Sequence, residues 1–304
     1  MTVTFSVYLE NIFHWKKENV IMKKLFALML TMAMSLSLAA CGGNGETVEN
    51  TYDTVTAGKL TVATSPDFAP YEFYAIGADG TPTLAGFDVA LAGYVADYLD
   101  LELEIVPMDF DGVLTELAAG SVDLGMAGLS PDPARMDAMD FSDTYYDGGQ
   151  SFVTVTENLH MFPDLESANV GDISVGAQVA SIQMELAKRF SPDVNIVSLP
   201  KVTDIIAELI SGKLDGAYIE TAVAQSYISN YPQLTIVCEV PYDDAEGSAI
   251  GVKKGNEALL KGVNEAIAAV LADGSMDQFV AEANELAAGE TASLVDGEIV
   301  KDEK

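Results

Sequence analysis

The sequence has few of the residues that bind metals or form disulfides. Its 304 residues include two cysteines and two histidines, and no Cys-x-x-Cys pair occurs. Cys41 and Cys238 lie far apart in the chain, and Cys238 ends an apolar run that is typical of a strand. Zinc and dithiol redox sites need more cysteine or histidine ligands than this. We therefore expect no metal site and no cofactor, with Cys238 as a small hydrophobic residue of the core.

Basic residues are also scarce. Lysine and arginine together number 15 against 47 aspartate and glutamate residues, so the formal net charge is −32. A field of this sign repels the phosphate backbone of nucleic acids and the surface of anionic membranes. Nucleic acid is thereby excluded as a partner, and any attachment to a membrane must be covalent or hydrophobic. The acidity itself is interpreted as that of a well-solvated surface.

What the chain does contain near its N-terminus is a pattern typical of an export signal. Met22-Lys23-Lys24 is a basic start, and the apolar stretch that follows, up to Leu38, is shorter than the roughly 20 residues that span a bilayer. The sequence Leu38-Ala39-Ala40-Cys41 resembles a bacterial lipobox. This resemblance implies cleavage before Cys41 and a diacylglyceryl thioether on its sulfur, whose fatty chains would hold the protein at the membrane. An unmodified signal peptide with a chance cysteine is the alternative.

The segments around this signal are interpreted from their composition. Residues 1–21 do not share the pattern of the signal, so we regard them as an extension or a mis-assigned start, with translation beginning at Met22. Residues 22–40 are the predicted signal peptide. Residues 41–57 are rich in glycine and polar residues, which favours a flexible tether.

Beyond the tether, apolar runs of strand type alternate with helical patterns. We expect strands at 60–63, 102–106, 124–127, 150–156, 173–177, 195–199 and 216–219, and helices at 87–99, 113–119, 181–190, 202–211, 221–230, 257–272 and 275–286. This alternation predicts two α/β units with mainly parallel sheets and helices on both faces. The segments that directly follow the strands are then the places to look for a binding site.

Four stretches of the sequence resemble a known family. They are residues 62–73 (VATSPDFAPYEF), 86–91 (GFDVAL), 120–128 (GSVDLGMAG) and 135–146 (RMDAMDFSDTYY). In this order and at this spacing they resemble the solute-binding proteins of polar-amino-acid ABC transporters. The resemblance implies an α/β, two-lobed type II periplasmic-binding-protein fold, in which each lobe is a mainly parallel sheet with flanking helices and two strands form the hinge. It implies lobe 1 at 58–148 and 248–288, lobe 2 with the hinge at 149–247, crossings near 150–156 and 243–248, and an acidic tail at 289–304.

The same resemblance implies a clamp for a free amino acid. In the family, an arginine at the position of Arg135 grips the ligand α-carboxylate, because its planar guanidinium matches a carboxylate through two parallel hydrogen bonds. Ser130 would donate to the same carboxylate, and Gly128 would offer its carbonyl group to the ligand ammonium. Arg135 is also the one arginine of the first α/β unit. A surface salt bridge to Asp132 or Asp137 is the alternative interpretation.

The second lobe is expected to complete this clamp. Glu220 stands where the family usually has an aspartate that pairs with the α-ammonium, and a plain role at the start of a helix is the alternative. Ala180 and Ser181 belong to the segment whose backbone N–H groups meet the carboxylate at a helix N-terminus. The family typically has glycine at the position of Ala180. The longer acid at Glu220 and the alanine at Ala180 are therefore departures of this sequence from the family pattern.

Aromatic and polar residues are expected around the ligand side chain. Phe68 and Phe110 match the aromatic positions that sandwich this side chain in relatives, and burial in the core is the alternative. Ser65 stands where several relatives have an acid that reads the side chain. Asp67 and Glu72 are neighbouring acids that either take over this role or are solvated. A polar amino acid is as far as the sequence defines the ligand.

These features together predict a function. The chain is expected to be the extracytoplasmic substrate-binding component of an ABC importer, lipid-anchored through Cys41 to the outer face of the cytoplasmic membrane. It would capture a polar L-amino acid by lobe closure and deliver it to a permease, acting as a monomer and not as an enzyme. An amino-acid-sensing ectodomain and a cyclohexadienyl-dehydratase-like enzyme on the same fold are the alternatives, although no arrangement typical of a catalyst stands out.

Overall fold

The computed structural model describes residues 51–243, 247–295 and 298–302. The predicted signal peptide, Cys41 and most of the predicted tether lie outside these residues. Within them the chain forms the predicted two-lobed α/β fold, in which each lobe is built on its own sheet and a third sheet belongs to the first lobe. No helix in the described ranges combines the length and the apolar character needed to cross a membrane.

The first lobe is built on a sheet of order β5-β1-β6-β13-β7. Its strands are β1 (Lys59–Thr64), β5 (Glu102–Pro107), β6 (Leu124–Gly125), β7 (Met139–Tyr146) and β13 (Ser248–Lys253). Strand β1 pairs in parallel with β5 and β6, whereas β13 runs antiparallel to β6 and β7. Because β13 follows the second lobe in the sequence, the chain leaves the first sheet and later returns to complete it.

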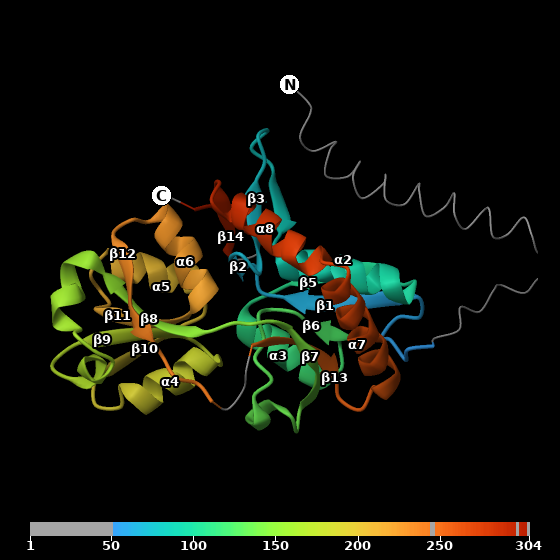
Figure 1. The fold of residues 1–304 in the computed structure, drawn as a ribbon, viewed down its shortest axis with the longest axis horizontal. Coiled ribbons are helices and arrows are strands. Elements are labelled where there is room, and N and C mark those ends of the chain that lie inside the picture. Colours follow the sequence, from blue (N-terminus) through green and yellow to red (C-terminus); the bar gives the residue numbers. More distant parts are fainter. Residues whose placement is uncertain (1–50, 244–246, 296–297, 303–304) are drawn as a thin grey trace, which may run out of the picture. The chain divides into compact units, whose positions relative to one another are not determined.

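Four helices pack around this lobe. They are α2 (Phe87–Leu99), α3 (Phe110–Ala119), α7 (Glu257–Ala272) and α8 (Ser275–Ala287). Helix α2 contacts both α7 and α8, so segments far apart in the sequence lie side by side (Figure 1). Phe87, Leu91 and Val95 recur every four residues on α2, and all three are buried. The helix ends at Leu99 and is capped by Asp100, whose left-handed backbone lets its N–H reach the carbonyl groups of the last turn.

The second lobe is built on a sheet of order β10-β9-β11-β8-β12. Its strands are β8 (Gln150–Val155), β9 (Ser174–Gln178), β10 (Asn195–Leu199), β11 (Gly216–Glu220) and β12 (Leu234–Glu239), and its helices are α4 (Ile182–Phe190), α5 (Val202–Ile210), α6 (Thr221–Asn230) and the 3-10 helices η2 (Thr156–Met161) and η3 (Glu166–Asn169). Strands β9, β10 and β11 are parallel, and β8 lies antiparallel between β11 and β12. Cys238 lies on β12, half-buried against the core.

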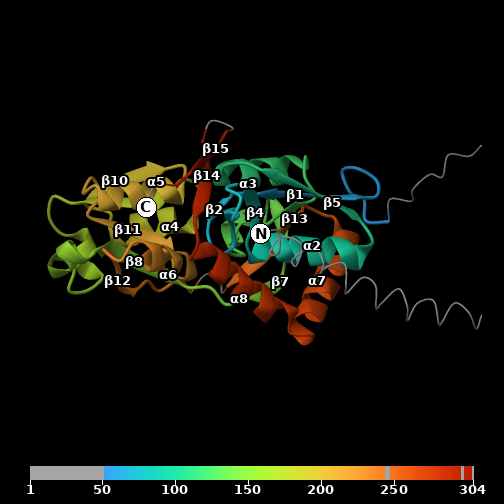
Figure 2. The same cartoon turned by 90° about the horizontal axis from the view of Figure 1, so that it is seen from above.

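A third sheet combines strands from the N-terminal and the C-terminal parts of the first lobe's sequence. Its strands are β2 (Asp67–Phe68), β3 (Glu72–Ile76), β4 (Pro82–Ala85), β14 (Thr291–Val295) and β15 (Glu298–Lys301). Strand β14 runs antiparallel to β3, with Thr291 opposite Ala75. Figure 2 shows β14, in red, at this sheet, where β3 lies between β14 and β2 in the strand order. The residues expected as an acidic tail therefore contribute two strands of the fold.

Candidate ligand-binding site

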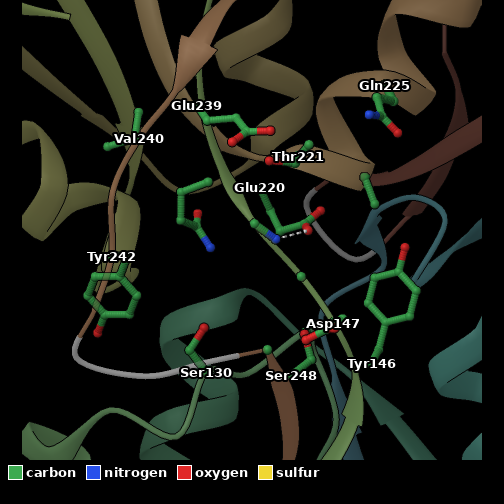
Figure 3. A pocket seen from close by; sticks show the side chains of 16 residues that line it. Ser130, Tyr146, Asp147, Glu220, Thr221, Gln225, Glu239, Val240, Tyr242 and Ser248 are labelled. Carbon is green, nitrogen blue, oxygen red and sulfur yellow. Dashed lines mark hydrogen bonds between the residues drawn. The ribbon is translucent and has the colours of Figure 1, made fainter.

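A pocket of about 530 Å³ lies where the chain passes between the two sheets. It is lined by sixteen described residues, and these come from both lobes (Figure 3). Gly128, Ser130 and Glu220, three of the predicted site residues, are among them. The lining carries carboxylates on Asp147, Glu220 and Glu239, and none of the sixteen residues is a lysine or an arginine. The pocket therefore has an acidic character.

Glu220 joins the end of strand β11 to the start of helix α6. Its side chain is 3% exposed. One carboxylate oxygen, Oε2, accepts the N–H of Val223 at 2.8 Å, and Oε1 accepts the N–H of Gly149 at 3.3 Å (Figure 3). Burial raises the pKa of Glu220 to about 7, although both N–H groups favour the charged form. The carboxylate thus caps α6, the alternative interpretation of the sequence, and also lines the pocket.

Gly128 occupies a position that suits no larger residue. Its φ is +55°, in the left-handed region, and a Cβ atom there would lie 2.7 Å from Cε1 of Phe68. The N–H of Gly128 donates to Oδ2 of Asp88 at 3.1 Å. Asp88 is itself held by the hydroxyl of Tyr145, at 2.7 Å from Oδ1. Asp88, at the start of α2, therefore fixes the position of the Gly128 backbone.

Arg135 reaches from the first lobe to the second. It ends the short 3-10 helix η1 (Pro133–Arg135). Its Nη2 donates to the carbonyl oxygen of Ala180 at 3.1 Å, and its Nη1 to that of Ser130 at 3.4 Å. The guanidinium carbon lies 5.7 Å from the centre of the Phe110 ring. Burial lowers the pKa of Arg135 from its usual value.

Arg135 forms no ion pair with the described acids of its own segment, although the nearby charge of Asp132 favours its charged form. Within the described ranges no ion pair joins it to Asp132 or Asp137. The carboxylate of Asp132 instead accepts the hydroxyl of Tyr242 at 2.5 Å and the N–H of Ala134 at 2.7 Å. Two neutral carbonyl groups are thus the hydrogen-bond acceptors of a guanidinium that is suited to bind a carboxylate.

Phe68 and Phe110 are both 7% exposed and both pack in hydrophobic clusters. Phe68 lies on β2, with its ring centre 5.3 Å from that of Tyr71. Phe110 begins helix α3 and lies beneath the guanidinium of Arg135. Neither ring is part of the pocket lining. The structure therefore places Phe110 beside Arg135 and Phe68 beside Tyr71, with both rings outside the open pocket.

The polar residues near Ser65 are buried rather than solvated. Ser65 is 3%, Asp67 7% and Glu72 0% exposed, and the hydroxyl of Ser65 donates to Oδ1 of Asp67 at 2.9 Å. Neither carboxylate oxygen of Glu72 meets a donor among the described residues. Burial, followed by the nearby charge of Asp88, raises the pKa of Glu72 well above its usual value. None of these residues lines the pocket.

Ala180 and Ser181 directly precede helix α4. Ala180 has a φ of +60°, a conformation that favours glycine, which agrees with the residue typical of the family. Oγ of Ser181 accepts the N–H of Met184 at 3.2 Å and donates to the carbonyl group of Gln178 at 2.7 Å. Ser181 is thus the N-cap of α4. This segment brings a capped helix N-terminus next to Arg135.

Several pocket residues were not predicted as site residues from the sequence, and one of them, Tyr146, was interpreted as structural. They are Tyr146, Gln150, Glu239, Tyr242 and Ser248. All lie in or next to the segments that join the two sheets, between β7 and β8 and between β12 and β13. The predicted crossings near 150–156 and 243–248 were the available signal, but which side chains point inward depends on how the strands pair.

Two lobes that share a polar pocket, with an arginine bridging them, define a protein that binds a small ligand between its lobes. Comparison with known proteins gives the class. The chain belongs to the bacterial extracellular solute-binding proteins, family 3, whose model matches residues 60–283. This membership confirms the family and the type of fold predicted from the four sequence stretches.

Individual relatives cover most of the chain. It is 30% identical over 263 residues to the arginine-binding extracellular protein ArtP of Bacillus subtilis, covering 85% of this chain and 96% of the relative. The structure of the amino acid ABC transporter substrate-binding protein AbpA from Streptococcus pneumoniae, bound to L-arginine, aligns with a TM-score of 0.71 and 33% identity over 76% of this chain and 96% of that one. An ancestral amino acid-binding protein, a precursor of cyclohexadienyl dehydratase, aligns with a TM-score of 0.67 and 28% identity over 74% of this chain and 95% of that one.

Proposed function

We propose that this protein is the exported substrate-binding component of an amino-acid ABC importer, which captures its ligand between the lobes and delivers it to a permease. The observation that carries the proposal is the position of Arg135, whose guanidinium spans the lobes and donates to the carbonyl groups of Ala180 and Ser130. A ligand α-carboxylate in their place would form a stronger, charge-assisted pair. Ser130 and the N-terminus of α4 then supply further donors to the same group.

Within this function, we propose a basic amino acid as the ligand. The α-carboxylate and α-ammonium groups of any amino acid would be matched by Arg135 and Glu220, which leaves the pocket with the carboxylates of Asp147 and Glu239. These two exposed acids favour a ligand that brings an additional positive charge. ArtP and AbpA, by their names and bound ligand, are arginine-binding proteins. Arginine is therefore the first candidate.

Calorimetry on the mature protein tests both statements. Arginine, lysine, histidine, glutamine and leucine are titrated separately, and arginine is expected to bind with the highest affinity. Arg135→Ala should abolish measurable binding of every ligand, because the α-carboxylate loses its bidentate partner. The matched control is Arg189→Ala, which removes the chain's other arginine from the last turn of α4 and should bind as the wild type does. Unchanged affinity in Arg135→Ala would contradict the clamp.

Binding without turnover is part of the proposal. The ancestral relative shows that a precursor of a dehydratase shares this fold, and Glu220, with a pKa of about 7, has the properties of a general acid. The protein is incubated with a cyclic prephenate-like acid, and the appearance of an aromatic product is followed by its absorbance. We expect no product. A product that disappears in Glu220→Gln would establish the enzyme instead.

We also propose where in the cell the protein is located. We infer that Cys41 carries the lipid that holds the exported protein at the outer face of the cytoplasmic membrane, and that translation starts at Met22. Expression in cells fed a labelled fatty acid should label the wild type and not Cys41→Ser. The unlabelled variant should appear in the soluble fraction outside the cytoplasm. Mass spectrometry of a form with the lipid removed would show whether Cys41 is the first residue.

A further inference from the structure

Asp67 belongs to the first lobe, but two of the three hydrogen bonds that its carboxylate accepts come from the second. Its Oδ2 accepts the backbone N–H of Val202 at 2.6 Å and the side-chain Nε2 of Gln178 at 3.2 Å. Its backbone carbonyl accepts the hydroxyl of Tyr227 at 3.2 Å. Within its own lobe, its Oδ1 accepts the hydroxyl of Ser65 and its backbone pairs with strand β3. One residue on the short strand β2 thus contacts strand β9 and helices α5 and α6.

The contact with Val202 is a helix cap provided by the other lobe. Val202 is the first residue of α5, and the side chain of the preceding residue, Lys201, forms no capping bond. A helix N-terminus leaves its first N–H groups without acceptors and favours a negative charge. Asp67 supplies both the acceptor and the charge. Strand β2 and helix α5 lie side by side in both views (Figures 1 and 2).

The neighbouring helices are capped differently. Helix α4 is capped by Ser181, α6 by Glu220 and α7 by Asn256, each from the residue that directly precedes the helix. These caps persist whatever the distance between the lobes. The cap on α5 requires the lobes to be in contact, because Asp67 lies on a strand of the first lobe and Val202, 135 residues away in the sequence, begins a helix of the second.

We propose that Asp67 is a positioning residue for lobe closure, which stabilises the closed form by capping α5 across the interface between the lobes. The proposal rests on the proposed function, in which closure captures the ligand. Separation of the lobes breaks the bonds to Val202, Gln178 and Tyr227 together and returns Asp67 and the start of α5 to water. Their net contribution therefore adds to ligand affinity without any contact to the ligand.

This role predicts a result that distinguishes it from reading the ligand side chain. An acid that contacts the ligand discriminates between amino acids, so its removal changes their order of affinity. A closure residue stabilises the same closed form around every ligand. Removal of Asp67 should therefore lower the affinity for every amino acid that binds, and by the same factor.

The test compares Asp67→Ala with two other variants. Asn256→Ala is the matched control, because it removes a helix cap that lies within the first lobe. Tyr227→Phe removes the hydroxyl donor to Asp67 and keeps the ring, so it remains informative if Asp67→Ala folds poorly. Small-angle scattering measures the radius of gyration with and without ligand, and calorimetry measures affinity for the amino acids that the wild type binds.

We expect Asp67→Ala to raise the radius of gyration of the ligand-free protein and to lower the affinity for each ligand by about tenfold. Tyr227→Phe should shift both quantities in the same direction by less. Asn256→Ala should lower the melting temperature and leave both quantities unchanged. An unaltered radius of gyration, or a changed order of ligand preference, in Asp67→Ala would overturn the proposal. If the wild type binds no amino acid, the proposed function fails, and the scattering comparison still decides the role of Asp67.

Discussion

Oε2 of Glu220 lies 2.8 Å from the backbone nitrogen of Val223, so the acid that lines the pocket is also the cap of the helix that follows it. A cap requires an oxygen that accepts a hydrogen bond. Pairing with a ligand ammonium requires a negative charge. Glu220 supplies both from one side chain, and substitutions can separate the two roles.

Glu220→Gln should keep the cap and lose the charge. We expect the ligand-free protein to be as stable as the wild type or more stable, because burial penalises the charged form of Glu220. Affinity for amino acids should fall by about tenfold or more, since the ligand ammonium loses a charged partner. Urea unfolding and calorimetry on the same preparation check the two outcomes. Lower stability together with full affinity would assign Glu220 to the helix alone.

Gly128→Ala tests how tightly the pocket loop is packed. The added Cβ would lie 2.7 Å from the ring of Phe68, so the loop or the ring must move, and ligand affinity should fall. Gly212→Ala is the control, because it also has a positive φ, of +73°, while its Cβ would meet no atom within 4 Å. Both variants should lose about 1 kcal/mol of stability from backbone strain. Equal affinities of the two variants would contradict the steric argument.

Glu72→Gln should be neutral or stabilising. The carboxyl group of Glu72 is fully buried and meets no donor among the described residues, and its pKa is raised well above its usual value. Burial therefore favours its protonated form, and glutamine has nearly the same shape. Asp123→Asn is the contrasting variant, because Asp123 accepts the N–H groups of Val55 and Thr61. It should lose about 1–3 kcal/mol in urea unfolding, and a similar loss in Glu72→Gln would show that Glu72 is needed as an anion.

The stability of the ligand-free protein should fall as the pH rises from about 5 to 8. Burial raises the pKa of Asp67 and of Asp88 to about 6 and that of Glu220 to about 7, whereas carboxyl groups in the unfolded chain titrate near about 4. Between these values the folded protein binds more protons than the unfolded chain, so the free energy of unfolding decreases with rising pH. Thermal unfolding at constant ionic strength measures the slope.

Two comparisons make the pH experiment specific. Repulsion within a protein of net charge −32 also destabilises it as the pH rises. Glu220→Gln removes one titrating group and hardly alters the total charge, so its profile should be flatter than that of the wild type near pH 7. A wild-type profile that rises across this window would contradict the assigned pKa directions.

Local sequence patterns were sufficient to predict the bounds of several helices. The expected bounds 87–99, 221–230 and 257–272 are those of α2, α6 and α7. Helix α3 begins earlier than expected, at Phe110 instead of residue 113, because its first turn carries few apolar residues. Periodicity reports which face of a helix is buried, and this information is contained in neighbouring residues. Strands β2, β3, β4, β7, β13, β14 and β15 were not predicted. Strands β7 and β13, for example, are defined by their pairing with each other, although the whole second lobe separates them in the sequence.

The candidate site, too, was predicted from the sequence only in part. The resemblance to the family implied Arg135, Ser130, Gly128 and Glu220 as the clamp, and their chemistry suits a free amino acid, which requires a fork of donors, an acceptor and an acid. The structure brings three of these four residues into one pocket and places Arg135 beside Ala180. It also places Phe68 and Phe110 in packed clusters, a distinction that depends on which residues surround each ring.

The sequence by itself determined the family, the alternation of strands and helices, and the residues suited to meet a carboxylate and an ammonium group. These properties depend on residue type and on short spacings along the chain. The tertiary structure decided that the last strands complete the first lobe, that Glu239 and Asp147 line the pocket, and that Asp67 caps a helix of the other lobe. Each of these relationships joins segments separated by many residues. Their proximity follows from how the sheets assemble, which short-range patterns do not contain.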